Sequence, residues 1–227
     1  RALEYPGHFP AGPHEHISWP FVTLSRQTGA GGHLLAQECQ KWMSLSRDPL
    51  FQGWQIFDTP TCMKLLEQAH LRIPYQSILD EEYHSEVEDL IYQVLTNRPP
   101  QQDVFRKVSN GIRALAYAGK VIIIGRAGVC ATADMPRGIH IRLVANYTDR
   151  VERMMRGLQV TESQARQIIE ERDTQRARLV RRHYSRSIDD PLLYDAVWNT
   201  SRDSLPVLAR QLVQFIREKA PQEHFLS

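Results

Sequence analysis

The stretch that decides the fold is Phe21-Val22-Thr23-Leu24-Ser25-Arg26-Gln27-Thr28-Gly29-Ala30-Gly31-Gly32-His33. Its first part is an apolar, β-branched run typical of a strand, and a glycine cluster separates that run from a helical pattern of apolar residues. Glycines let backbone N–H groups turn toward one anion, and the N-terminal dipole of the following helix adds a positive field. The stretch therefore predicts a strand, a phosphate-binding loop and a helix, in that order.

The loop departs from the usual phosphate-loop consensus G-x-x-x-x-G-K-[ST]. When Gly31 takes the place of the second consensus glycine, Arg26 stands at the first, Gly32 at the lysine and His33 at the Ser/Thr. A glycine cluster is therefore present, but the usual lysine is missing. The alternative is that the glycines only permit close packing of helix on strand. Arg26 weighs against it, because a cation at the mouth of the loop is expected beside phosphates.

Composition fits one sizeable α/β domain of 227 residues, with 42% hydrophobic and 24% charged residues. The formal net charge of +2 gives no strong global field, and no nucleic-acid-binding motif is present, so we expect no nucleic-acid partner. The three cysteines, Cys39, Cys62 and Cys130, lack C-x-x-C spacing, which favours a reducing compartment and no zinc site.

Nothing in the sequence predicts a membrane segment. The longest apolar run, Val121–Ile124, is far too short to cross a bilayer, and residues 1–20 contain no apolar signal-peptide core. We therefore expect a cytoplasmic protein. The sequence gives no indication of oligomeric state.

Strand and helix patterns alternate along the chain, which implies a parallel sheet covered on both faces by helices. Residues 1–17, rich in proline and glycine, predict an extended arm or linker before a domain at 18–227. Expected strands lie near 21–25, 54–57, 121–124, 139–145 and 196–198. Expected helices lie near 32–45, 60–71, 77–96, 101–118, from 149, 161–183 and 205–216, with a capping box at 161–164.

Gly125-Arg126 follows the apolar run at 121–124, which is typical of a strand buried on both faces. Ligands of open α/β sheets sit outside the carboxyl ends of the strands. Arg126 there can clamp a phosphate through two hydrogen bonds, or it can reach past the strand end into solvent. The residues themselves favour neither alternative.

The segment 150–186 is dense in arginine and almost free of lysine. This composition favours forked recognition of phosphate oxygens, and the alternative is a solvated helix face with i,i+4 pairs such as Glu152 with Arg156. For the cluster as a whole we favour phosphate binding. Its arginines are Arg150, Arg153, Arg156, Arg166, Arg172, Arg176, Arg178, Arg181, Arg182 and Arg186.

Asp58 and Thr59 directly follow the second expected strand. Asp58 there can bind a ribose, a base edge or a phosphate-bound metal. Either residue can equally cap a helix that begins at Pro60. The sequence leaves these alternatives open.

Together these motifs resemble the cytidylate kinase-like family of P-loop nucleoside monophosphate kinases. The resemblance rests on their order and spacing, and spans about residues 20–216. The matching motifs are Ser25-Arg26-x-x-Gly29-x-Gly31-Gly32, Phe57-Asp58, Val121-Ile122-Ile123-Ile124-Gly125-Arg126, Thr148-Asp149-Arg150, Glu171-Arg172-Asp173, Arg182-His183-Tyr184, Asp190-Pro191, Tyr194-Asp195 and Asn199-Thr200-Ser201.

The resemblance implies a P-loop NTPase-type three-layer α/β/α fold with a helical acceptor-binding insert at about 59–118 and an arginine-rich lid at about 150–190. It implies transfer of a phosphoryl group from ATP, with Mg²⁺, to a nucleoside monophosphate such as CMP or dCMP. The implied donor site is Thr28, Gly29, Ala30, Gly31, Gly32 and His33; the implied catalytic cations are Arg26, Arg126, Arg172 and Arg176; the implied acceptor site is Asp58, Thr59, Arg106 and Arg126.

Two departures from the family pattern leave two functions open. Cytidylate kinases carry Asp where this chain has Ala127, and the loop lacks the Ser/Thr that ordinarily contacts Mg²⁺. The first function is an active nucleotide kinase, favoured by arginines at the loop, the strand end and the lid. The second is a nucleotide-binding sensor or regulatory domain of the same fold, favoured by the missing lysine and hydroxyl.

Overall fold

The computed structural model describes residues 19–58 and 101–221 of the chain. Five strands form one sheet in the order β2-β3-β1-β4-β5, with every neighbouring pair parallel. These strands are β1 (Phe21–Arg26), β2 (Gln55–Phe57), β3 (Val121–Ile124), β4 (Gly138–Val144) and β5 (Ala196–Asn199). The predicted parallel sheet is therefore confirmed, and the strand that leads into the glycine cluster lies at its centre.

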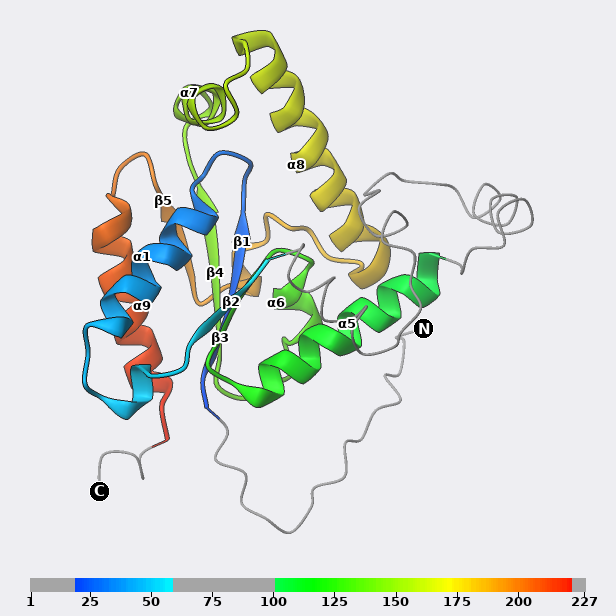
Figure 1. Ribbon diagram of the computed structural model, residues 1–227. Coiled ribbons are helices and arrows are strands. Elements are labelled where there is room, and N and C mark those ends of the chain that lie inside the picture. Colours follow the sequence, from blue (N-terminus) through cyan, green and yellow to red (C-terminus); the bar gives the residue numbers. More distant parts are fainter. Residues whose placement is uncertain (1–18, 59–100, 222–227) are drawn as a thin grey trace.

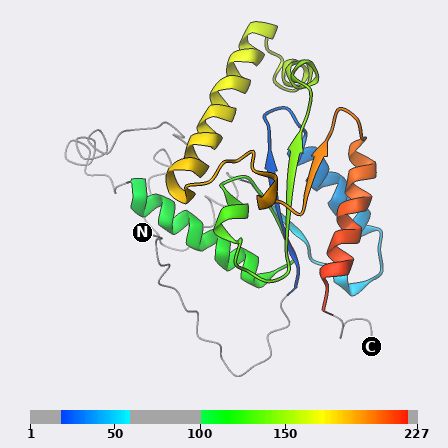
Figure 2. The same cartoon turned by 180° about the vertical axis from the view of Figure 1, so that it is seen from behind.

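Helices cover both faces of the sheet, as Figures 1 and 2 show, so the expected three-layer α/β/α architecture is confirmed. On one face α1 (Gly32–Ser44) packs against α9 (Leu205–Lys219), and on the other lie α5 (Gln101–Ala118) and α6 (Gly128–Ala131). Beyond the carboxyl ends of the strands stand α7 (Tyr147–Leu158) and α8 (Glu162–Tyr184). No helix within the described ranges is long and apolar enough to span a membrane.

The larger hydrophobic core lies between the sheet and the α1–α9 pair. It contains Val22 and Leu24 of β1 together with Ile139, Ile141 and Leu143 of β4, all of them fully buried. A second core on the opposite face joins Phe21 and Ile123 to α5. Strand β1 thus contributes apolar side chains to both cores.

Next to the second core, β1 and β4 present polar side chains. The Thr23 hydroxyl lies 2.8 Å from Nδ1 of His140, and the Arg142 guanidinium donates to the Ser25 hydroxyl over 2.9 Å. These two strands thus present several polar side chains on this face of the sheet, and Thr23, Ser25 and Arg142 border the carboxyl-end pockets described below.

Element boundaries agree closely with the sequence expectations. The helix at 101–118 and the strand at 121–124 match residue for residue, and the capping box at Thr161 is confirmed. The Glu152–Arg156 pair also forms, with 3.2 Å between its charged atoms. Helix α7 begins at Tyr147, two residues before its expected start, and α9 runs three residues beyond 216.

Three short elements were not predicted: α6 and the 3₁₀ turns Pro49–Phe51 and Pro191–Leu193. A helix of four residues contains too little sequence to show a periodicity. The expected arm at 1–17 and the expected helices at 60–71 and 77–96 lie outside the described residues.

His140 supplies a test of this packing. Burial lowers its pKa below the ordinary value of 6.5, and the nearby Lys219 acts in the same direction, against an opposing effect of Asp195. In the unfolded chain the ring takes up a proton as the pH falls through 6.5, whereas in the folded chain it does so only at lower pH.

We therefore predict that the free energy of unfolding falls as the pH drops below about 6.5, by at most about 1.4 kcal/mol per pH unit for this group. Urea unfolding at pH 5.5 and 7.5 measures the effect. The substitution His140→Gln should reduce the difference between the two pH values, and the exposed His33→Gln serves as the control. Equal pH dependence in the original chain and in His140→Gln would contradict the prediction.

Candidate active site

The glycine loop (residues 26–33) turns sharply between β1 and α1. Gly29 and Gly31 have φ values of +81° and +86°, a region that L side chains rarely adopt. A Cβ at Gly29 would lie 2.7 Å from the carbonyl oxygen of Arg150, so this position excludes a side chain on packing grounds as well. The loop therefore has the backbone conformation that its glycines predicted.

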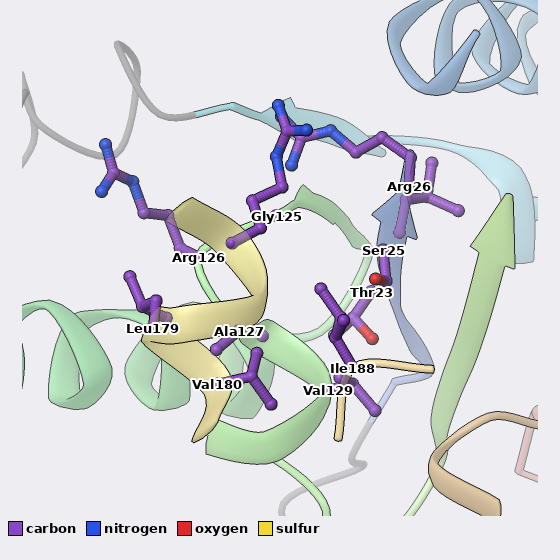
Figure 3. Close-up of a pocket in the computed structure, with 13 residues that line it drawn as sticks. Thr23, Ser25, Arg26, Gly125, Arg126, Ala127, Val129, Leu179, Val180 and Ile188 are labelled. Atoms are coloured by element: carbon purple, nitrogen blue, oxygen red, sulfur yellow. The ribbon is translucent and has the colours of Figure 1, made fainter. Parts of the chain in front are cut away.

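Arg26 crosses from the glycine loop to the end of β3. A Cβ at Gly32, the lysine position of the consensus, would lie 3.3 Å from Cγ of Arg26, so the arginine stem runs beside this glycine. A Cβ at Gly125 would lie 2.1 Å from Nη1 of Arg26, so the guanidinium rests directly on that glycine. Both glycines accommodate the same arginine, and Figure 3 shows its side chain reaching across the pocket.

The end of β3 has an unusual backbone. Gly125, Arg126 and Ala127 have successive φ values of +82°, +53° and +50°. Non-glycine residues in this region cost about 1–3 kcal/mol each and occur preferentially at ligand sites. Arg126 is half-buried, and in Figure 3 its side chain extends to the side of the pocket opposite Arg26.

A carboxylate from α8 reaches the glycine loop. Asp173 accepts hydrogen bonds from the Thr28 N–H over 2.7 Å and from the Thr28 hydroxyl over 2.8 Å. It also accepts from the guanidinium of Arg150 over 2.5 Å and from that of Arg176 over 3.1 Å. Arg176 additionally donates to the Thr28 hydroxyl oxygen over 2.6 Å. Loop, α7 and α8 therefore converge on one carboxylate.

Two arginines of α7 hold the glycine loop through its carbonyl groups. Arg150 donates to the Thr28 carbonyl over 3.3 Å, and Arg153 donates to the Gly29 carbonyl over 3.4 Å. Arg153 also binds the hydroxyl and the carbonyl of Thr200, at 2.8 and 2.7 Å. These contacts fix the shape of the loop, which is a different role from the phosphate contacts that the sequence indicated for the segment.

Sequence reasoning did not assign a role in the site to Asp173. A signal was available, because Asp173 and Arg176 are three residues apart and such pairs face each other on a helix.

A pocket lies between the carboxyl ends of β1 and β3, the start of α6 and one side of α8 (Figure 3). Arg26, Arg126 and Arg176 line it together with the strand-end glycine Gly125. The remaining wall includes the apolar side chains Val129, Leu179, Val180 and Ile188. The structure thus brings three of the four predicted catalytic arginines to one pocket with a cationic side and an apolar side.

The other predicted residues are more dispersed. His33 is exposed at the start of α1, and its Nε2 lies 3.3 Å from the Asp58 carboxylate at the end of β2. Arg106 is exposed on α5, and Arg172 is exposed on α8, where it makes no hydrogen bond or ion pair with the described residues. Thr59 lies outside the described residues. The catalytic role of Arg172 and the acceptor role of Arg106 stay predictions.

The two described cysteines are buried or half-buried. Burial raises the pKa of Cys39 to about 12 and that of Cys130 to about 11, so both thiols are protonated at neutral pH. No cluster of three or more His, Cys, Asp or Glu side chains suited to a metal ion occurs among residues 19–58 and 101–221.

Comparison with known proteins identifies the family. The cytidylate kinase-like family matches residues 21–202, a span that begins at β1 and ends beyond β5. The chain belongs to the cytidylate kinase-like family. The resemblance inferred from the motifs is therefore confirmed, and family membership supports nucleotide or small-molecule kinase function.

Comparison with solved structures finds similar folds, and one of them superposes well. A protein of uncharacterized function from Eubacterium ventriosum ATCC 27560 superposes with a TM-score of 0.64 at 15% identity, covering 87% of this chain and 98% of that chain. Shikimate kinase from Acinetobacter baumannii in complex with shikimate gives 0.44 at 15% identity, with 89% and 95% covered. The Mycobacterium tuberculosis APS kinase in complex with AMPPNP and APS gives 0.47 at 12%, with 89% and 99% covered. No curated protein matches the sequence.

The Asp173 contacts generate a stability prediction. Asp173→Ala leaves Arg150 and Arg176 without their carboxylate and removes two hydrogen bonds of Thr28, so we expect the free energy of unfolding to fall by about 2 kcal/mol. Urea unfolding measures this. The matched control is Glu162→Ala, which breaks an exposed pair with Arg166 on the same helix and should cost at most about 0.5 kcal/mol. Similar losses in the two variants would show that the Asp173 contacts add nothing beyond a surface pair.

Proposed function

We propose that this protein transfers the terminal phosphoryl group of ATP to a nucleoside monophosphate, CMP or dCMP first among the candidates, or to a related small phosphorylated acceptor. The observation that carries the proposal is the meeting of Arg26, Arg126 and Arg176 around one pocket beside the glycine loop. Phosphoryl transfer depends on positioning and charge neutralisation, and a pocket of this kind can provide both.

The loop region fits a phosphate group. Four donors already surround the two oxygens of the Asp173 carboxylate: the N–H and hydroxyl of Thr28 and the guanidinium groups of Arg150 and Arg176. Phosphate oxygens accept the same charge-assisted hydrogen bonds as carboxylate oxygens. The backbone N–H groups of the loop and the start of α1 add further positive potential.

Each arginine has a distinct task in the proposed reaction. Arg26, lying on Gly125, would neutralise charge between the donor and acceptor sites, and Arg176 would do so from the α8 side. Arg126 would orient the acceptor from the far side of the pocket. Helix α8 would exclude water, because competing hydrolysis consumes the donor. When bound, ATP would supply the transferred group, and Mg²⁺ would help to neutralise the charge of the donor phosphates.

Magnesium would depend mainly on phosphate and water oxygens. The consensus hydroxyl is replaced by His33, whose imidazole is a poor ligand for a hard cation. The Asp58 carboxylate lies 3.3 Å from Nε2 of His33 and is the candidate oxygen ligand from the protein. Mg²⁺ commonly keeps several waters and binds proteins through only one or two carboxylates, so this sparse set is compatible with it.

A regulatory domain that binds nucleotide without turnover is the alternative. The specific observation in its favour is Gly32, which stands at the lysine position and whose neighbouring space contains the stem of Arg26. Arg26 then directs its charge to β3 instead of along the loop. A kinase assay with radiolabelled ATP across nucleoside monophosphates, combined with a measurement of ATP binding, separates the two functions. Micromolar ATP binding with no transfer to any acceptor would leave the regulatory function.

We predict that Arg126→Ala lowers turnover well over tenfold, in line with the ~10²–10³ losses found for charge-stabilising groups. The assay is the same transfer reaction, with kcat and KM measured separately. Arg156→Ala is the control, because Arg156 is an exposed arginine paired with Glu152 on α7 and lies outside the pocket. An unchanged rate in Arg126→Ala would remove Arg126 from the site.

A further inference from the structure

Arg142 is a buried charge in the middle of the fold. It lies on β4, and its side chain is only 5% exposed. An arginine at such a position costs folding free energy unless its charge is paired and its N–H groups are hydrogen-bonded. Neither the sequence motifs nor the proposed transfer step uses this residue, so its retention in the sheet calls for another explanation.

One side of the Arg142 guanidinium is held rigidly. Nη1 donates to the Ser25 hydroxyl over 2.9 Å, and Ser25 in turn lies 3.3 Å from the Tyr194 hydroxyl. The Tyr194 hydroxyl donates to the carbonyl of Ile188 over 2.8 Å. The centre of the Tyr194 ring lies 5.8 Å from the guanidinium carbon of Arg142. Strand β1 and the segment after α8 therefore fix the orientation of the Arg142 guanidinium group.

The other side of the guanidinium has a partner that is easily displaced. Nη2 donates to the Asp189 carboxylate over 2.6 Å, but the Asp189 side chain is 73% exposed. A carboxylate so exposed keeps most of its hydration and loses little when it turns into solvent. The pair is thus asymmetric: a fixed, dehydrated cation faces a hydrated, movable anion.

Arg142 also borders a second pocket, which has about 100 Å³ of space. One water molecule needs about 10–15 Å³ of such space, so the pocket has room for a group the size of a phosphate. Arg26 and Arg176 line it as well, against the carboxylates of Asp173 and Asp189. Asp173 is already engaged by Thr28, Arg150 and Arg176, so displacing Asp189 leaves three arginines facing a single paired carboxylate.

We propose that this second pocket is an anion subsite for the acceptor, in which a phosphate or carboxylate group takes the place of Asp189 on Arg142. The inference rests on the proposed kinase function, which it deepens. Arg26, Arg176 and Ile188 line both pockets, so the two pockets adjoin each other. The acceptor class is accordingly a compact molecule with an anionic group at Arg142 and an uncharged body against Leu179 and Val129.

The first test measures anion binding without any reaction. Inorganic phosphate is titrated into the full chain in the presence of saturating ADP, which occupies the glycine loop, and binding is followed by NMR. Arg142→Gln should weaken phosphate binding at least about tenfold, the loss expected for a charge-assisted hydrogen bond. Arg166→Gln, an exposed arginine on α8 paired with Glu162, is the matched control and should bind as the original chain does.

A second variant keeps the proposal testable if the loss of a buried arginine unfolds the chain. Asp189→Asn changes an exposed side chain and removes the competing charge, so it should tighten phosphate binding severalfold. In the transfer assay the same variant should lower the KM for the acceptor and leave kcat unchanged. A role of the Arg142–Asp189 pair in stability alone predicts a lower melting temperature with no change in phosphate affinity.

The outcomes separate the inference from the proposed function. Phosphate affinity that is unchanged or weaker in Asp189→Asn, or the lack of phosphate binding by the original chain, overturns the subsite even if kinase activity is found. Phosphate binding that is lost in Arg142→Gln and tightened in Asp189→Asn supports the subsite. That result would stand if no transfer were detected with any acceptor, in which case the kinase function alone would fail.

Discussion

The carboxylate of Asp173 is the contact on which the arrangement of the site depends. It joins the glycine loop to α7 through Arg150 and to its own helix through Arg176. Without a negative group at this position, two guanidinium groups would approach each other beside a loop that already carries positive potential. The acidic side chain therefore allows the cations to gather in the absence of a ligand and gives α8 a defined place over the loop.

The arginines of segment 150–186 divide into groups with different tasks. Arg150 and Arg153 bind loop carbonyls and support the loop, Arg176 faces the pocket, and Arg156 and Arg166 form surface pairs on their own helices. Solvated i,i+4 pairing, one of the two alternatives for the segment, holds for Arg156 and Arg166, and phosphate recognition stays a prediction for Arg176. Contact with the loop, more than the number of arginines, distinguishes them.

Much of the fold followed from local pattern. The helix at 101–118 and the strand at 121–124 matched because an amphipathic period and a bounded apolar run each carry their own signal. The glycine loop was predictable for the same reason. The direction of Arg26 was not, because it depends on Gly125, which lies far along the chain.

Arg142 escaped prediction for a related reason. Its sequence neighbours form an ordinary strand, and its partners Ser25 and Asp189 are 117 and 47 residues away. A charge in a strand normally indicates a solvent-facing position, whereas here a polar sheet face and a covering segment bury it. Long-range pairing of this kind has no local signature.

Helix α8 has the geometry of a lever. Its 23 residues span about 35 Å, and Asp173 ties it to the loop near the midpoint. At its far end His183 stacks on Phe105 of α5, with ring centres 3.7 Å apart. When a stiff helix is held near its midpoint, a small tilt about that point moves its two ends in opposite directions. A change in the Asp173 contacts would therefore displace the end of α8 that packs against α5.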